Sequence, residues 1–87
     1  MLCNLVGRHF YTSTILTPDD SIRIVPEPTN PKDENAHQVW ARFENGWKHV
    51  GYVERASAES LVGRTVTSAR ILSVGTFHAT PLAIEVS

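Results

Sequence analysis

The sequence predicts an all-β fold with one short helix, built as a small six-stranded barrel of the OB or SH3 type. Short segments rich in Val, Ile and Thr are separated by turn-forming residues, a pattern typical of small barrels. The pair Asn45-Gly46 is a strong hairpin signal. Because 87 residues suffice for one core and no linker interrupts them, we expect a single domain over residues 1–87.

The first part of the chain is expected to form two strands. Leu2–Tyr11 is the first, and Thr12–Asp20 is a connection that contains a Pro-Asp-Asp turn signal. Ser21–Val25 alternates apolar and polar residues, which predicts a half-buried second strand.

The segment Glu27–Ala36 follows, with two prolines, two asparagines and three carboxylates. Proline fixes φ, and Asn and Asp side chains bond to nearby backbone in turns. We therefore expect a stiff surface loop, and loops on rigid scaffolds often carry binding sites. The interpretation is that this loop forms one wall of a ligand site.

A hairpin comes next, with strands Ala36–Glu44 and Trp47–Val53 joined by Asn45-Gly46 in a type I′ turn. That turn would place Glu44 opposite Trp47. The resulting register puts one set of side chains on the core face: Val39, Ala41, Phe43, Val50 and Tyr52.

The same register makes predictions for the outer face of the hairpin. Trp40 would lie opposite Gly51 and cover its bare backbone. Arg42 would pair with His49.

The last part of the chain is expected to hold the helix and two strands. Arg55–Val62 contains good helix formers, and Gly63 suits the position after a helix. Thr65–Val74 is rich in β-formers, Gly75–Thr80 turns the chain, and Leu82–Val86 alternates as a closing strand.

Composition limits the function classes. The net charge of −1 argues against broad duplex binding, although a small pocket for a strand end needs few cations. One cysteine fits a reducing compartment. No apolar run approaches the ~20 residues that cross a bilayer, and no signal-peptide pattern is visible. We expect an intracellular protein, cytoplasmic if bacterial and nuclear if eukaryotic, with no membrane partner.

Several motifs together point to a family. The loop sequence Glu-Pro-Thr-Asn-Pro-Lys-Asp-Glu-Asn-Ala over residues 27–36 is followed by Val-Gly-Tyr-Val at 50–53. With Val6–Tyr11 and the closing Pro81-Leu82, this pattern closely resembles the HIRAN domain. HIRAN domains occur at the N-terminus of fork-remodelling ATPases and alone in bacterial and phage proteins. The resemblance implies an OB-like barrel that holds the 3′ end of single-stranded DNA, with a helicase-like ATPase domain or partner protein beside it.

The resemblance also implies site residues. Asn30 and Asp33 would meet the terminal nucleotide, while Phe10 and Tyr11 would stack on bases at ~1–3 kcal/mol each. Three further positions differ in residue type from the DNA-binding relative. His9 stands in place of an arginine, Lys32 in place of an aromatic residue, and Tyr52 in place of a polar residue. The full candidate set is therefore His9, Phe10, Tyr11, Asn30, Lys32, Asp33 and Tyr52.

Each candidate also has a structural interpretation. Asn30, Asp33 and Asn35 are turn formers that can satisfy loop backbone groups. Of Phe10 and Tyr11, strand alternation places one in the core and the other outside. Trp47 is typical of a cross-strand surface contact. The remaining basic residues are expected to be ordinary solvated charges: Arg8, Arg55, Arg64 and Arg70.

Catalytic and metal functions find little support. The histidines are scattered at positions 9, 37, 49 and 78, unlike the close ligand spacing of zinc sites. A magnesium nuclease cluster is conceivable from the loop carboxylates Asp19, Asp20, Asp33 and Glu34. No nucleophile or Walker motif is present. We therefore expect a binding domain without cofactor, not an enzyme.

Two binding functions remain open at this point. The first is recognition of a single-stranded DNA end. The alternative is a protein or peptide adaptor that uses the same loop and barrel rim. Added salt should weaken the first steeply and the second much less.

Overall fold

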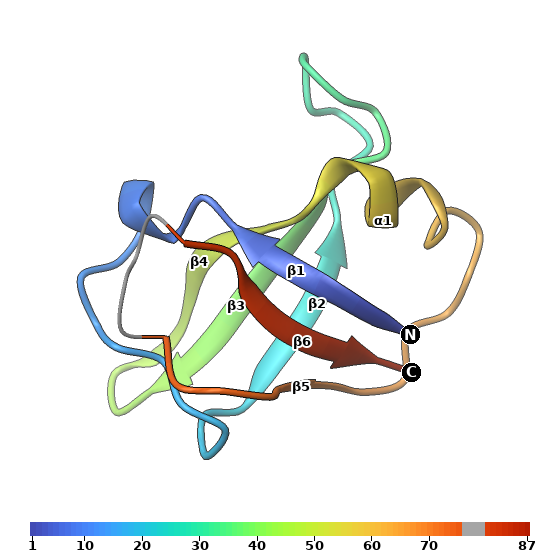
Figure 1. Cartoon of the computed structure of the whole chain (residues 1–87). Helices are drawn as coiled ribbons and strands as arrows, with labels where there is room; N and C mark the ends of the chain where they lie inside the picture. Colours follow the sequence, from blue (N-terminus) through green and yellow to red (C-terminus); the bar gives the residue numbers. More distant parts are fainter. Residues whose placement is uncertain (76–79) are drawn as a thin grey trace.

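The computed structural model describes residues 1–75 and 80–87, and its strands form one antiparallel sheet of six strands curled into a barrel (Figure 1). The strand order is β2-β3-β4-β1-β6-β5. The elements are β1 (Leu2–Val6), the 3₁₀ turn η1 (Arg8–Phe10), β2 (Ile22–Pro26), β3 (His37–Phe43), β4 (Gly46–Val53), α1 (Arg55–Glu59), β5 (Ala69–Ile71) and β6 (Leu82–Val86).

The two edge strands of the sheet almost close the barrel. A single antiparallel bridge between Ser21 and Arg70 joins the start of β2 to β5. Near-closure removes most of the unpaired strand edge that would otherwise invite aggregation. The predicted fold class, an all-β barrel with one short helix, is confirmed.

The core follows the alternation of the strands. On β3 the inward side chains of Val39 and Ala41 are fully buried, and Leu5 of β1 and Ile84 of β6 face them from the other side of the barrel. Ala58 of α1 is also buried, so the helix closes one end of the core. A residue outside the strands, Leu16 in the long connection after η1, adds a further fully buried side chain.

The β3–β4 hairpin forms as predicted, but its turn lies one residue earlier. Phe43 pairs with Gly46, so Glu44 and Asn45 are the turn residues. Gly46 takes the positive φ of 112°, and no described residue other than glycine has a positive φ. The predicted type I′ turn over Asn45-Gly46, which needs two positive φ values, is therefore wrong.

The shifted turn changes the pairs on the outer face. Trp40 lies opposite His49, not Gly51, and Arg42 lies opposite Trp47, not His49. The predicted partners on β4 are thus wrong by two residues. Because side chains alternate with a period of two, a shift of two residues keeps both tryptophans on the outer face.

A β-bulge then reverses the alternation near the end of β4. The register shifts between Val39 and Trp40, and Val39 pairs with Gly51, so Val50 is the extra residue. Val50 stays buried, whereas Tyr52 turns to the outer face and is half-buried. The prediction that Tyr52 belongs to the core is therefore wrong.

Gly51 sits where the neighbouring strand comes very close. A Cβ atom at this position would lie 2.5 Å from the carbonyl oxygen of Val6 and 2.7 Å from Cδ1 of Leu5. Such distances are far inside van der Waals contact, so only glycine fits. The Val-Gly-Tyr segment is thus a packing requirement between β1 and β4.

The first strand is shorter than predicted. Gly7 has φ 76° and ends β1, and the chain then makes the η1 turn, in which the amide of Phe10 donates to the carbonyl of Gly7. Strand alternation therefore does not apply to Phe10 and Tyr11. Both are exposed, by 78% and 45%, so the prediction that one of them lies in the core is wrong.

The second half of the chain agrees in part with the prediction. The closing strand is confirmed. The predicted helix over Arg55–Val62 is too long, because α1 ends at Glu59 with Ser60 as its C-cap, and Gly63 lies three residues beyond that cap in a left-handed turn with φ 76°. The long strand expected over Thr65–Val74 is wrong, because only Ala69–Ile71 pairs with β6. The turn expected over Gly75–Thr80 includes residues 76–79, which lie outside the described residues. No helix in the described part of the chain has the length and apolarity to span a membrane.

Candidate nucleic-acid interface

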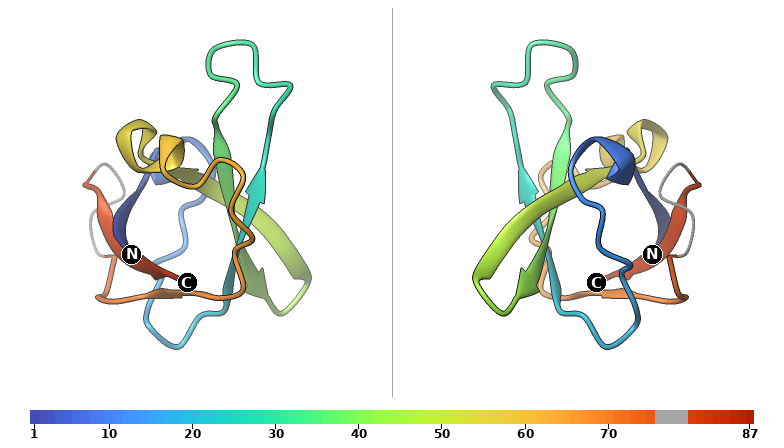
Figure 2. Two further views of the ribbon diagram at one scale, coloured as in Figure 1. Left: turned by 90° about the vertical axis from the view of Figure 1, so that its right-hand side faces the viewer. Right: turned by 90° about the vertical axis from the view of Figure 1, so that its left-hand side faces the viewer.

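Three segments gather at one end of the barrel: the loop Glu27–Ala36, the η1 turn with Tyr11, and the start of α1 (Figures 1 and 2). The loop extends well beyond the barrel body. Distant parts of the sequence thus meet around one rim. Polar and aromatic side chains of these segments make up the candidate site.

The loop is stiffened by its own side chains. The Asn30 carboxamide oxygen accepts the amides of Lys32 and Asp33 at 2.9 and 3.2 Å. The Asp33 Oδ1 atom accepts the amide of Asn35 at 3.0 Å. These bonds are the turn-forming role expected for Asn and Asp, and they fix the loop shape before any ligand binds.

Glu27 joins the loop to the sheet. Its carboxylate accepts hydrogen bonds from the side-chain amide of Asn30 at 3.0 Å, from the Tyr52 hydroxyl at 2.9 Å, and from the side-chain amide of Gln38. The Gln38 bond holds the pKa of Glu27 below its ordinary value, aided by Tyr52 and Asn30 and opposed by partial burial. Glu27 is therefore ionised at neutral pH and acts as a fixed hub.

Tyr52 is the residue through which this hub reaches the aromatic rings. Burial, followed by the hydrogen bond to Glu27, raises the pKa of Tyr52, so the phenol keeps its proton and donates. Its ring packs edge-on to Tyr11, with centroids 5.9 Å apart, and to His49 at 4.9 Å. The centroids of the His49 and Tyr11 rings are 4.3 Å apart. One connected cluster thus runs from the loop to the residue after η1.

Asp33 presents a carboxylate at the loop's edge. Its side chain is 19% exposed, and Oδ2 lies 3.9 Å from Nε of Arg55, whose side chain is 76% exposed. Such a loose surface ion pair stabilises the fold little. Both groups are therefore available to a ligand, one as an acceptor and the other as a cation.

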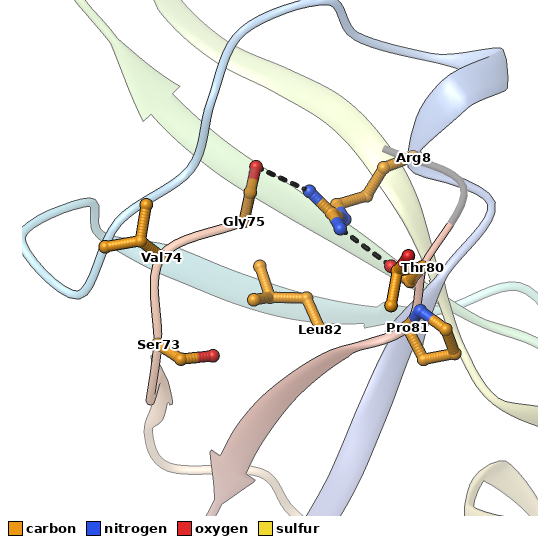
Figure 3. A pocket seen from close by; sticks show the side chains of 7 residues that line it. All are labelled: Arg8, Ser73, Val74, Gly75, Thr80, Pro81 and Leu82. Carbon is orange, nitrogen blue, oxygen red and sulfur yellow. Dashed lines mark hydrogen bonds between the residues drawn. The ribbon is translucent and has the colours of Figure 1, made fainter. Parts of the chain in front are cut away.

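The residue that anchors η1 is a buried arginine that the sequence does not single out. Arg8, expected to be a solvated charge, is only 1% exposed. Figure 3 shows its guanidinium between two carbonyls, donating to Gly75 at 3.2 Å and to Thr80 at 2.7 Å. Burial lowers its pKa. No sequence signal marks this role, because the acceptors are backbone carbonyls some 70 residues away.

A family model for the HIRAN domain matches residues 2–78. The chain belongs to the HIRAN family. Among solved structures, the chain is similar to the HIRAN domain of human HLTF, with a TM-score of 0.74 and 21% identity over 99% of this chain and 73% of that one. No curated protein matches the sequence.

HIRAN domains are nucleic-acid-binding modules, and this general function extends to the present domain. The geometry shows how such a HIRAN domain arranges the sequence-derived candidates. Tyr52 and Asn30 both donate to Glu27, Tyr11 packs against the Tyr52 ring, and the backbone amide of Asp33 donates to Asn30.

The other three candidates lie at the margins of this HIRAN site. His9 and Phe10 are exposed, and their rings contact each other with centroids 3.9 Å apart. Lys32 is exposed in the loop.

The described residues do not assemble the alternative metal centres. Within residues 1–75 and 80–87, no three His, Cys, Asp or Glu side chains come together as a metal site. Asp20, a member of the conceivable nuclease cluster, instead accepts the amide of Thr17 at 2.8 Å in its own turn. His78 lies outside the described residues.

Proposed function

We propose that this HIRAN domain binds single-stranded DNA at its 3′-hydroxyl end, in the site between the loop and Tyr11. The observation that carries the proposal is the Asn30–Glu27–Tyr52 hydrogen-bond chain. It holds the loop that bears Asp33 in a fixed position beside the aromatic cluster. A terminal sugar and its base need an acceptor and a stacking ring in such a fixed relation.

The negative charge of Asp33 determines which chemical form of the 3′ end the site would accept. A 3′-hydroxyl is a hydrogen-bond donor, and Oδ2 of the carboxylate is an acceptor with a loose partner in Arg55. A 3′-phosphate would bring a second negative charge to the same place and be repelled. Arg55 and Lys32 are exposed cations near the site, suited to the phosphate on the 5′ side of the terminal nucleotide.

The rings supply affinity without sequence preference. Tyr11 is 45% exposed and Phe10 is 78% exposed, so both have a free face for a base. Stacking on such rings contributes ~1–3 kcal/mol per base for any base. The domain is therefore expected to read the terminus of the strand and not its sequence.

The test compares short oligonucleotides that differ only at the end, one with a 3′-hydroxyl and one with a 3′-phosphate. The native domain should prefer the hydroxyl by roughly 10- to 100-fold, the range of a hydrogen bond to a charged group. Asp33→Asn keeps the Oδ1 acceptor used by Asn35 but removes the charge. It should abolish the preference.

Asp19→Asn is the matched control, because Asp19 is an exposed turn carboxylate at the opposite end of β2. This variant should keep the full preference. Equal binding of both oligonucleotides by the native domain would contradict the proposal.

In this role the domain would act inside the cell, in DNA repair or replication-fork processing. It would direct a helicase-like ATPase, in the same protein or as a partner, to free 3′ ends. The domain itself supplies binding, and the motor supplies hydrolysis.

One structural feature favours the second candidate, a peptide adaptor. A hollow of about 200 Å³ lies between the base of the loop and the segment after α1. Its apolar lining includes Pro26, Pro28, Leu61 and Val62. A peptide bound there would dissociate little with added salt, whereas bound DNA should dissociate steeply. A salt titration of the bound ligand separates the two functions.

A further inference from the structure

Five aromatic or basic side chains share the outer face of β2, β3 and β4. In the strand register Arg23 lies opposite Trp40, and Trp40 lies opposite His49. Arg42 lies opposite Trp47 one pair further toward the hairpin turn. We call these residues the outer strip: Arg23, Trp40, Arg42, Trp47 and His49.

The rings of the outer strip are ordered by contacts with each other. Trp40 and His49 are stacked, with centroids 5.5 Å apart and an interplanar angle of 19°. The Arg23 guanidinium lies 3.8 Å from the centroid of the Trp47 ring. Such cation–π pairs hold both groups in place without removing the outer side of the guanidinium from solvent.

Trp40 is fixed further by a hydrogen bond. Its indole Nε1 donates to the Gln38 carboxamide oxygen at 2.8 Å. Gln38 in turn donates to Glu27, the hub of the end site. The indole plane is thus set by the same network that orients the loop, so little rotamer entropy remains to be lost on stacking.

The outer strip is continuous with the end site. His49 contacts Trp40 on one side and Tyr11 on the other, with ring centroids 4.3 Å apart in the second pair. A polymer that leaves Tyr11 along the sheet therefore meets His49, then Trp40. No gap in the row of rings separates the two regions.

The charge of this face differs from that of the whole chain. The formal net charge is −1. On the outer face, however, Arg23 and Arg42 are exposed, and the carboxylate of Glu27 is already held by three hydrogen bonds. Alternating rings and arginines match bases and phosphates of a single strand.

We propose that the outer strip is a second binding surface for single-stranded DNA, on the 5′ side of the end site. Bases stack on Trp40, while Arg42 and Arg23, the latter held over the Trp47 ring, contact phosphates. This inference rests on the proposed function in one respect, namely that the same strand has its 3′ end at Asp33. It adds that affinity increases with strand length beyond the terminal nucleotides.

The test measures affinity for a trinucleotide and for a strand of about eight nucleotides, both with a 3′-hydroxyl, a length within the usual site size of such folds. The native domain should bind the longer strand at least tenfold more tightly. Trp40→Leu retains an apolar surface residue but removes the stacking plane. It should reduce that gain by roughly tenfold, with a much smaller effect on trinucleotide affinity.

Arg42→Gln provides a second variant that does not alter any ring. For the longer strand, it should reduce the slope of the logarithm of affinity against the logarithm of salt concentration by about the amount expected for the loss of one phosphate contact. Arg70→Gln is the matched control, because Arg70 is also exposed but lies on β5, paired with Glu85. It should behave as the native domain. Thermal unfolding of each variant verifies that the fold is intact.

The outcomes separate the two proposals. If Trp40→Leu and Arg42→Gln leave the length-dependent gain intact in folded protein, the outer strip does not bind DNA and the inference is overturned. If the gain depends on Trp40 but the preference for a 3′-hydroxyl is absent, the end site fails and the strip stands. A native domain that shows no gain with length also overturns the inference.

Discussion

The two segments that frame the end site, the loop Glu27–Ala36 and the η1 turn, are held in opposite ways. Beyond Glu27, which binds Gln38 and Tyr52 of the sheet, the loop is shaped by short-range hydrogen bonds among its own polar groups, such as those of Asn30 with the amides of Lys32 and Asp33. The η1 turn is held by one buried arginine, Arg8, that reaches carbonyls near the far end of the chain.

This difference determines how each segment responds to change. A loop built from local bonds should lose function at a single position without loss of the fold. A turn held by a buried cation couples its position to the stability of the barrel. The DNA-end proposal requires both the loop and the η1 turn. Variants of the loop and variants of the turn therefore test it independently.

The largest effect is expected from Arg8→Met, which keeps an apolar stem but removes the guanidinium. The carbonyls of Gly75 and Thr80 would lose their donor, and the unfolding free energy should fall by about 2–4 kcal/mol. Chemical denaturation measures this difference.

Arg70→Met is the control, because its ion pair with Glu85 is exposed and contributes little. It should change the unfolding free energy by less than about 1 kcal/mol. Equal losses of unfolding free energy in the two variants would show that Arg8 does not anchor the turn. They would contradict the proposed difference between the loop and the turn.

An intermediate effect is expected from Phe10→Ala in the η1 turn. Because Phe10 is 78% exposed, its loss should leave stability unchanged. If its ring stacks on a base, affinity for a 3′-hydroxyl oligonucleotide should fall by roughly tenfold. Fluorescence anisotropy with a labelled strand measures this change. Unchanged affinity would restrict base stacking to Tyr11 and the outer strip.

The smallest effect concerns the hub of the loop. Hydrogen bonds lower the pKa of Glu27 in the folded state, so its ionised form stabilises the fold above the ordinary glutamate pKa of about 4.3. That contribution is lost as the pH falls through the lowered pKa. Glu27→Gln should therefore be less stable than the native domain at pH 7, and the difference should shrink below about pH 4. A difference independent of pH would contradict the role of the ionised hub.

The same contrast explains what the sequence could and could not predict. The loop was predictable because Pro, Asn and Asp act within a few residues of their own position. The hairpin and the closing strand were predictable for the same reason. Each depends on local backbone preference or simple alternation.

Long-range features were not predictable. The bulge at Val50 arises because β4 must meet both β3 and β1, with Gly51 pressed against the backbone of Val6. It turns Tyr52 out of the core, where simple alternation had placed it. The burial of Arg8 depends on carbonyls that come from the opposite end of the chain. Both wrong predictions, the core position of Tyr52 and the solvated charge of Arg8, concern residues that shape the site.

The most direct test of the central claim is an NMR titration of the native domain with a short 3′-hydroxyl oligonucleotide. We predict that amide and side-chain shifts concentrate at Tyr11, Asn30, Asp33 and Tyr52, with a 3′-phosphate strand producing much smaller changes. Shifts that cluster around Pro28 and Val62 instead, or that are equal for the two strands, would contradict the account.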